Sequence, residues 1–430
     1  MLKKRSLLMF VFSILLLGLL AGCGDSDETG SGSGEDVIID FMHLWPEGSS
    51  RQHNHIVQEI IDEFEDENSN VTIRLEVLSN EQYKEKLSVY GASNELPDVG
   101  MTWAGGFLDP YISGNMFAAL DDIRSDDFIP GTTEAYAVDG VTYGLPIELN
   151  ITPIYYNKAI FEDVGVEVPE TWDEFKGVVQ ALVDADVTPI TLGNRDAWTG
   201  SMWYMYLADR IGGPAVLNDA ISREGTFEDP ALIEAAREVQ ALVEMDAFVN
   251  GFNGLGNDEA KGYFLNEQAA MFLMGTWDLP EWTTNEDNPQ EFRDSIDYFK
   301  FPVYEGGAGD IDSFVGGPGV GLFVAEDSDV KDEAMKFVEF FVDRWGEKAV
   351  TEAGVIPATT VDTDGIDLPQ MYIDILDDLS EASNLTLYAD VQMSPASADV
   401  HLDMIQAIFG DEITPEEFAE RHEETLANEE

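Results

Sequence analysis

Four tryptophans, each placed just after a segment expected to be a strand, are the side chains best suited to hold a ligand. They are Trp45, Trp103, Trp198 and Trp277. A Trp ring offers a flat apolar face and one N–H donor, and ligands of open α/β sheets bind beyond the carboxyl ends of the strands. Any one of these residues could equally be a core side chain, because Trp is highly buried on average. Four of them in analogous positions favour a common cleft.

Polar side chains accompany three of these tryptophans: Glu47 follows Trp45, Arg195 precedes Trp198, and Asp278 follows Trp277. Sugars combine apolar C–H faces with rims of hydroxyls, so aromatic faces flanked by carboxylates or amides suit them. The same aromatic residues, with Glu148 and Asp278, would also suit a polyamine or another organic cation. We therefore expect a carbohydrate-binding cleft, with an organic cation as the alternative ligand.

Signals for catalysis or for a metal are weak. The sequence contains no Gly-Lys dipeptide and therefore no P-loop, and it lacks Gly-x-Gly-x-x-Gly and Gly-x-Ser-x-Gly motifs. Its five histidines form no zinc motif; His53 and His55, two residues apart, would point to different sides of a helix. Carboxylate pairs of the kind used by glycosidases are expected by chance among 85 acidic residues. We expect a non-enzyme without cofactor or metal; a secreted carbohydrate-active enzyme is the alternative from another class.

The charge of the chain limits its partners. The 430 residues carry 22 Lys and Arg against 85 Asp and Glu, a formal net charge of −63. Such a surface repels phosphates, which argues against nucleic acid as a partner. Self-repulsion destabilises a compact chain unless salt screens it. We therefore expect a surface adapted to salt, in a protein that works outside the cell.

The N-terminus reads as an export signal. Basic residues at 3–5 precede an apolar run from Leu7 to Leu20, followed by Leu20-Ala21-Gly22-Cys23. This order is typical of a secretory signal peptide over 1–22. The last four residues resemble a bacterial lipobox, which implies cleavage before Cys23 and lipidation of this only cysteine. The absence of a twin-Arg pair favours export by the Sec route, and residues 23–36, rich in Gly, Ser and acids, are expected to be a flexible tether.

The segments that must position the tryptophans alternate between strand and helix patterns. Strands are expected at 37–42, 71–77, 96–101, 189–192 and 269–274, and amphipathic helices at 230–245, 330–341, 368–379 and 396–409. Thr171 with Glu174 and Thr414 with Glu417 form capping boxes that start two further helices. Trp172 and Trp345 are expected in the core. Alternating strands and helices predict an α/β fold with parallel sheets, and the length predicts two lobes.

Four segments together resemble the extracellular solute-binding proteins (family 1) of ABC importers, which include maltose- and oligosaccharide-binding proteins. The first is Leu96-Pro97-Asp98-Val99 followed by Trp103. The second runs from Tyr143-Gly144-Leu145-Pro146 through Tyr155-Tyr156-Asn157-Lys158 to the capping box at Thr171. The third is Ala269-Ala270-Met271 with Gly275-Thr276-Trp277, and the fourth is Gly316-Gly317 with the helix after Val330 and Gly354-Val355-Ile356-Pro357. The resemblance covers most of 37–425.

This resemblance implies a two-lobed periplasmic-binding-protein-like fold of type II, each lobe a mostly parallel sheet flanked by helices, with the ligand cleft at the hinge. The lobes would be 37–147 plus about 316–360, and 148–315 plus about 361–430. Glu148 matches a hinge carboxylate that contacts sugar, and Trp103 and Trp277 match aromatic residues of the cleft. The loop around Ala398 and Asp399 should face the site, although its residues are small. Asn150 and Gly317, on the segments expected to cross between lobes, complete the candidate ligand-binding set. The implied partners are a carbohydrate, the permease subunits of an ABC importer and the membrane, reached through the lipid on Cys23 at the extracellular face; the protein itself would be a monomer.

Overall fold

The computed structural model describes residues 36–123, 125–363 and 365–428. The chain divides into two units, 1–35 and 36–430, and the described residues all belong to the second. The expected signal peptide, Cys23 and the tether up to residue 35 lie outside the described residues. Among the helices of the described part, none combines the length and the apolar character needed to cross a membrane.

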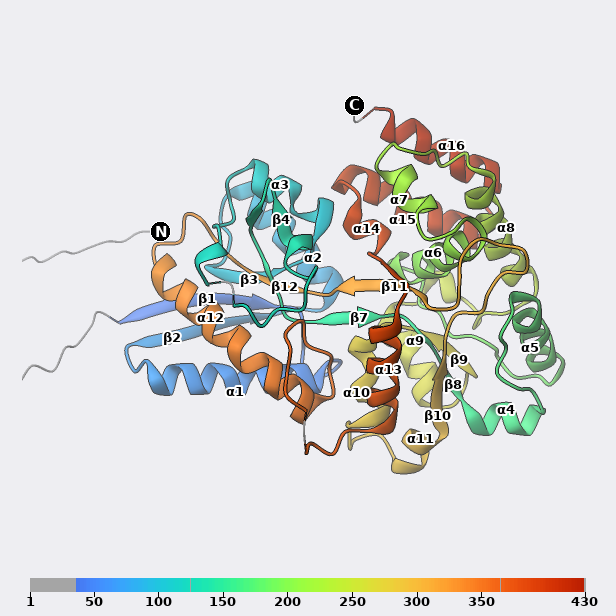
Figure 1. Ribbon diagram of the computed structural model, residues 1–430, viewed down its shortest axis with the longest axis horizontal. Helices are drawn as coiled ribbons and strands as arrows, with labels where there is room; N and C mark the ends of the chain where they lie inside the picture. The colour runs from blue at the N-terminus through green and yellow to red at the C-terminus, as the bar shows by residue number, and fades with distance from the viewer. Residues whose placement is uncertain (1–35, 124, 364, 429–430) are drawn as a thin grey trace, which may run out of the picture. The chain divides into compact units, whose positions relative to one another are not determined.

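A five-stranded sheet in the order β2-β1-β3-β12-β6 forms the first half of the fold (Figure 1). Its strands are β1 (Val37–His43), β2 (Val71–Val77), β3 (Val99–Thr102), β6 (Leu145–Pro146) and β12 (Gly321–Val324). The pairs of β1 with β2 and with β3 are parallel, whereas β12 runs antiparallel to β3 and β6. In β2, Val71 and Ile73 are buried while Thr72 and Arg74 are exposed, which confirms the alternation read from the sequence.

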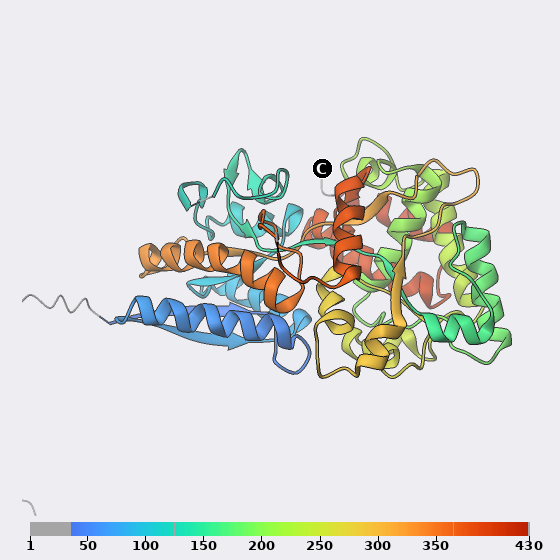
Figure 2. The ribbon, with the colours of Figure 1, turned by 60° about the horizontal axis from the view of Figure 1, so that its bottom comes forward.

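Helices pack beside this sheet. They are α1 (Arg51–Glu67), α2 (Asn80–Ser93), α3 (Asp109–Ser113) and α12 (Lys331–Lys348), with a small hairpin of β4 (Ala137–Val138) and β5 (Val141–Thr142). Figure 2 shows α1 and α12 running side by side. Their contact includes Phe64 and Phe337, whose ring centroids lie 5.1 Å apart. Each helix thus buries an apolar stripe against the other and against the sheet.

Two strands that pair with each other lie between the halves of the fold, as Figure 1 shows. These strands, β7 (Leu149–Ile151) and β11 (Ser313–Pro318), are antiparallel, with Asn150 opposite Gly317. Strand β13 (Asn384–Thr386) adds to β11 in parallel register. The Cβ of any residue at Gly316 would overlap the backbone carbonyl of Asn150, so glycine there permits the close approach of the two crossing strands.

The second half is built around a sheet in the order β10-β8-β9. Its strands are β8 (Ile154–Asn157), β9 (Met271–Leu273) and β10 (Ile296–Phe299). Both pairings of β8 are antiparallel, so the expectation of a mostly parallel sheet is wrong for these ladders. Only Thr152 and Pro153 separate β8 from β7, so β8 enters this sheet directly from the crossing strand. The strand expected at 189–192 makes only isolated parallel bridges, from Ile190 to Phe248 and Met271.

Helices surround this second sheet. They are α4 (Lys158–Val164), α5 (Trp172–Asp184), α6 (Trp198–Gly212), α7 (Val216–Ile221), α8 (Pro230–Glu244), α9 (Asn257–Leu265), α10 (Leu279–Thr283), α11 (Gln290–Ser295), α13 (Gln370–Glu381), α14 (Ala389–Gln392), α15 (Pro395–Phe409) and α16 (Pro415–Leu426). The capping boxes at the starts of α5 and α16 are both formed, as the sequence predicts. Trp172 and Trp345 are buried, also as predicted.

The buried apolar side chains fall into two clusters. One draws on residues 39–147 and 320–358, and the other on residues 149–315 and most of the C-terminal helices. We propose, on this basis and from the β7–β11 crossing, that the lobes are 37–147 with about 316–360 and 148–315 with about 361–430. Val391 in α14 packs in the first cluster while Ala389 and Met393 pack in the second, so α14 contacts both lobes.

Candidate functional site

A hollow of about 470 Å³ is lined by residues of both clusters and of the crossing strand β7. Eight of the ten predicted ligand-binding residues line it: Trp45, Trp103, Glu148, Asn150, Arg195, Trp198, Trp277 and Asp278. Glu47 instead lines a separate hollow beside α1, and Gly317 is not among the lining residues, whereas Gly319 is. The hollow is called the cleft below.

Three half-buried aromatic residues form a row on the second-lobe side of the cleft: Trp198, Trp277 and Tyr388. The ring centroids of Trp198 and Trp277 lie 6.0 Å apart at an interplanar angle of 60°. Those of Trp277 and Tyr388 lie 5.8 Å apart at 64°. These edge-to-face contacts hold the rings at fixed angles. We call the three residues the aromatic row.

The local backbone explains how two members of the row reach the cleft. Trp277 lies in a short 3-10 turn (Thr276–Asp278) directly after β9, and its ring folds back over Gly275. A Cβ at Gly275 would overlap ring carbons of Trp277, so only glycine leaves room for this ring position. Trp198 is the first residue of α6 and follows Ala197, whose φ of 61° is in the left-handed region. Such a conformation is uncommon for a residue with a side chain and marks a constrained site.

On the first-lobe side of the cleft, one tryptophan is buried and the other has a cation over its ring. Trp45 is only 4% exposed, and its ring stacks on Trp345 with centroids 4.9 Å apart and planes 7° apart. Trp103 is half-buried, with the ammonium Nζ of Lys84 5.1 Å from its ring centroid. Lys84 also lies 3.6 Å from a carboxylate oxygen of Asp390 in α14. On this side, therefore, Trp103 is the aromatic residue with a substantial exposed surface, and a cation lies over it.

A chain of polar side chains runs along the hinge from the first lobe to the aromatic row. Nε2 of His53 in α1 and Oε1 of Glu148 lie 2.9 Å apart, without the alignment of a hydrogen bond. Nδ2 of Asn150 donates to the other oxygen of Glu148 at 3.4 Å. The hydroxyl of Thr276 donates to Oδ1 of Asn150 at 3.0 Å. Glu148 and Asn150 both line the cleft and are buried, so their side chains are shielded from the bulk solvent.

Beside Trp277, a buried ion pair lines the same cleft. The ammonium of Lys261 in α9 donates to Oδ1 of Asp278 at 2.8 Å. Burial raises the pKa of Asp278, an effect that Lys261 partly offsets. Arg195, by contrast, is exposed and lies within ion-pair distance of Asp196 and Glu259. The two predicted charged residues of this lobe thus have different environments, one enclosed and one at the rim.

Several lining residues were missed by sequence reasoning: His53, Lys84, Lys261 and Tyr388. Ala398 and Asp399 lie within α15, in the helix expected at 396–409, and neither lines the cleft, so the expectation that they face the site is wrong. An aromatic side chain of the C-terminal segment does line the cleft, that of Tyr388, directly before α14. An aromatic residue just after the extended segment 384–386 was the available signal, of the same kind that identified Trp277.

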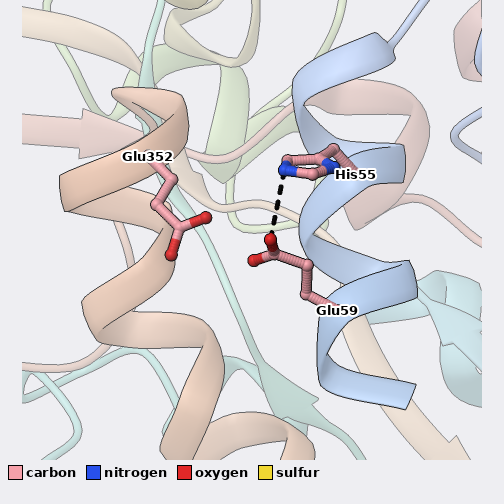
Figure 3. Close-up of side chains that lie close together, drawn as sticks. All are labelled: His55, Glu59 and Glu352. Atoms are coloured by element: carbon pink, nitrogen blue, oxygen red, sulfur yellow. Dashed lines mark ion pairs between the residues drawn. The ribbon is translucent and has the colours of Figure 1, made fainter. Parts of the chain in front are cut away.

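A cluster of ionisable side chains lies outside the cleft (Figure 3). It consists of His55 and Glu59 on α1 and Glu352 just beyond α12, whose ligand atoms lie within 4.8 Å of one another. Nζ of Lys348 reaches Glu59 at 2.9 Å and Glu352 at 3.3 Å. The side-chain ammonium of Lys348 therefore supplies the positive charge at this cluster, and we assign no metal to the cluster.

Comparison with known proteins gives consistent findings. The sequence profile described as "Bacterial extracellular solute-binding protein" matches residues 48–344. A "Multiple sugar-binding protein" from Streptococcus mutans is 26% identical over 333 residues, which are 75% of this chain and 74% of that protein.

Solved structures agree on the fold. A chain from a study of xylan utilization by the thermophilic bacterium Caldanaerobius polysaccharolyticus superimposes with a TM-score of 0.85 at 30% identity, covering 90% of this chain and 99% of that one. A "Chitin oligosaccharide binding protein" superimposes with a TM-score of 0.84 at 24% identity, covering 92% and 99%. Two lobes of mixed α/β structure are common to all three chains.

Proposed function

The chain belongs to the bacterial extracellular solute-binding proteins, and from this premise we propose that it is the binding receptor of an ABC importer for a carbohydrate, most simply an oligosaccharide. The observation that carries the proposal is the composition of the cleft: an aromatic row on one lobe, and buried polar groups of Glu148 and Asn150 at the hinge. The apolar C–H surface of a pyranose packs on Trp faces, and carboxylate and amide oxygens accept hydrogen bonds from its hydroxyls. Two similar proteins, a multiple sugar-binding protein and a chain from a study of xylan utilization, support a carbohydrate ligand.

The proposed mechanism is closure at the hinge. A ligand held on the aromatic row that also contacts Glu148 and Trp103 would bridge both lobes, and so favour the closed arrangement by its differential affinity. A permease would then recognise the closed receptor. No covalent bond is made or broken in this scheme. Scattering should show compaction when the correct sugar is added, and an unchanged radius at saturation would contradict the mechanism.

We further propose that the receptor is exported by the Sec route, lipidated at Cys23 and held as a monomer at the extracellular face of the membrane by the 23–36 tether. This proposal rests on the lipobox-like sequence. Mass spectrometry of the membrane fraction would detect the lipid, and Cys23→Ser should release the protein into the medium. A mature wild-type protein that starts elsewhere and carries no lipid would refute the anchor.

The net charge of −63 supports a proposal of salt adaptation. Screening of carboxylate repulsion should make the free energy of unfolding rise between low and molar NaCl. Denaturation by urea at several salt concentrations measures this directly. A stability that does not rise with salt would leave the acidic composition without this explanation.

The ligand class is tested by a thermal-shift screen of mono- and oligosaccharides in high salt, with spermidine as the comparison. A ligand that binds only the folded state raises the transition temperature by mass action. A shift with an oligosaccharide and none with spermidine supports the proposal; the reverse result would favour the organic cation. An assay for new reducing ends, run on the same glycans, separates binding from turnover, and their release would identify a carbohydrate-active enzyme instead.

A further inference from the structure

The ion pair of Lys261 and Asp278 is unusual because it is enclosed and still faces the cleft. Each side chain is only 9% exposed, and both residues are among those that line the hollow. Nζ and Oδ1 are separated by 2.8 Å, so one oxygen of the carboxylate is satisfied. Charges that are removed from water need such a partner to be tolerated.

The second oxygen of the same carboxylate has no partner. Oδ2 of Asp278 is buried and accepts no hydrogen bond from any described residue. A buried charged acceptor left unsatisfied is costly. Asp278 directly follows Trp277, a member of the aromatic row, and both residues line the cleft. A donor supplied by a ligand lying on Trp277 would satisfy this oxygen.

The groups around Asp278 decide its charge. Burial raises the pKa of Asp278 most, Lys261 lowers it, and the carboxylates of Glu281 and Asp258 raise it further. Tyr155 is also close enough for the charge of Asp278 to raise the pKa of its hydroxyl. Burial also opposes the charge of Lys261, but Asp278 and Glu281 outweigh this effect and raise its pKa. Lys261 is thus the one neighbour in this set that favours the ionised carboxylate.

We propose that Lys261 is a positioning residue for ligand binding, which holds the Asp278 carboxylate so that Oδ2 accepts a hydrogen bond from a hydroxyl of a sugar ring lying on Trp277. The inference rests on the proposed function and narrows it. A hydroxyl suits this acceptor better than a second ammonium, which would face the ammonium of Lys261 at the same carboxylate. The ligand is therefore a glycosyl unit with a free hydroxyl at this edge.

The test compares variants by calorimetry with xylotriose, chitotriose and spermidine as probes, across about pH 5 to 8. Lys261→Met should weaken sugar binding about tenfold or more, the scale of a hydrogen bond to a charged group. It should also make binding acid-sensitive: without Lys261 the pKa of Asp278 rises further, so the acceptor is lost at a higher pH than in the wild type. Lys261→Arg should restore the flatter profile. Lys300→Met, which removes another ion-paired lysine of this lobe outside the cleft, should leave affinity and profile unchanged.

Wild-type affinity and pH profile in Lys261→Met would overturn the inference, as would tight binding of spermidine that Asp278→Asn abolishes. If Lys261→Met fails to fold, Lys261→Gln keeps a donor without the charge and should still show the acid-sensitive profile. If the wild type binds neither these sugars nor any sugar of the wider screen, the proposed function fails, but the premise that Lys261 keeps Asp278 ionised is still tested without ligand. Carbon-13 spectra of aspartate-labelled protein, with Asp278→Asn to assign the signal, should show a higher pKa for Asp278 in Lys261→Met than in the wild type; an unchanged titration would refute the role.

Discussion

Trp45 and Trp277 occupy equivalent places in the two lobes, each just beyond a strand and at the edge of the same cleft, yet their surroundings differ. Trp45 contacts both Trp345, stacked with ring centroids 4.9 Å apart, and His53, whose ring centroid is 4.8 Å away. Trp277 is half-buried, and the described rings nearest to it meet it at 60° and 64°. The first ring is enclosed by its own lobe; the second keeps surface toward the cleft.

The difference shows that the role of a strand-end tryptophan depends on what packs behind it. In the first lobe, α12 places Trp345 against Trp45, so the two rings become part of the core. In the second lobe, Gly275 lets the Trp277 ring fold back, and Trp198 and Tyr388 support it edge to face. We therefore expect Trp45 to act mainly on stability and Trp277 mainly on binding.

The largest expected effect is on stability at the first-lobe ring. Trp45→Ala removes a buried aromatic side chain and should lower the free energy of unfolding by about 3–5 kcal/mol. Urea denaturation in high salt measures the loss. Trp345→Ala should cost a similar amount, and the double variant should cost less than the sum because the two rings contact each other. If Trp45→Ala unfolds like the wild type but no longer binds sugar, the contrast with Trp277 is wrong.

The second expected effect is a loss of stability at low pH, caused by protonation of His43, which lies beside Trp45. His43 is fully buried, its Nδ1 accepts from the backbone N–H of Trp45 at 3.3 Å, and burial lowers its pKa to about 4. The unfolded state, with a pKa near 6.5, binds more protons between these values. Stability from this residue is therefore fully present above about pH 6.5 and is lost as pH falls toward 4, by about 3 kcal/mol.

The contribution of His43 to this loss of stability is measured as the difference between the wild type and a His43 variant. Burial also lowers the pKa of His401 and His422 in the second lobe, so the wild type alone would report all three. His43→Gln should lose about 3 kcal/mol less than the wild type between pH 7 and pH 4, measured by urea denaturation at each pH. Equal losses of stability in both proteins would show that protonation of His43 does not destabilise the first lobe.

A smaller effect, on binding, is expected at the second-lobe ring. Trp277→Ala should weaken sugar binding by about 1–3 kcal/mol, by analogy with the stacking of nucleobases on aromatic residues, while its stability should fall less than that of Trp45→Ala. Calorimetry with the sugar found in the screen measures the affinity. Trp172→Phe is a matched control, since Trp172 is a core ring outside the cleft. Wild-type affinity in Trp277→Ala would remove Trp277 from the site.

Features set by nearby residues could be predicted from the sequence. The pattern over 269–274 gave the buried strand β9, and the Thr–Glu pairs gave the starts of α5 and α16, because strand burial and helix caps depend on residues a few positions apart. The candidate site was found through the same local signal, an aromatic residue directly after a strand. Eight of the ten candidate residues consequently line one hollow.

Features that depend on contacts between distant residues could not be predicted from the sequence. The burial of Trp45 depends on Trp345, 300 positions away in the sequence. Tyr388, which lines the cleft, directly precedes α14, and the end of α14 packs against Gly106, where a Cβ would overlap the carbonyl of Met393. Lys261 carries no local sign of its role, since its partner Asp278 follows an intervening strand. Pairing across such separations is fixed by tertiary packing, which residue spacing does not encode.

The smallest expected effect is at Trp103, where the two sides of the cleft are most alike. Lys84 lies over this ring and within 3.9 Å of Glu81 as well as near Asp390. Lys84→Met keeps the apolar stem and removes the charge, so it should change stability and sugar affinity by at most about 1 kcal/mol, the range of partly exposed ion pairs and cation–π contacts. Because salt screens such pairs, the difference from the wild type should shrink between low and molar NaCl. Calorimetry at both salt concentrations measures it. A loss of affinity in Lys84→Met larger than that in Trp277→Ala would reverse the comparison, and would place the main contact with the ligand on the first lobe.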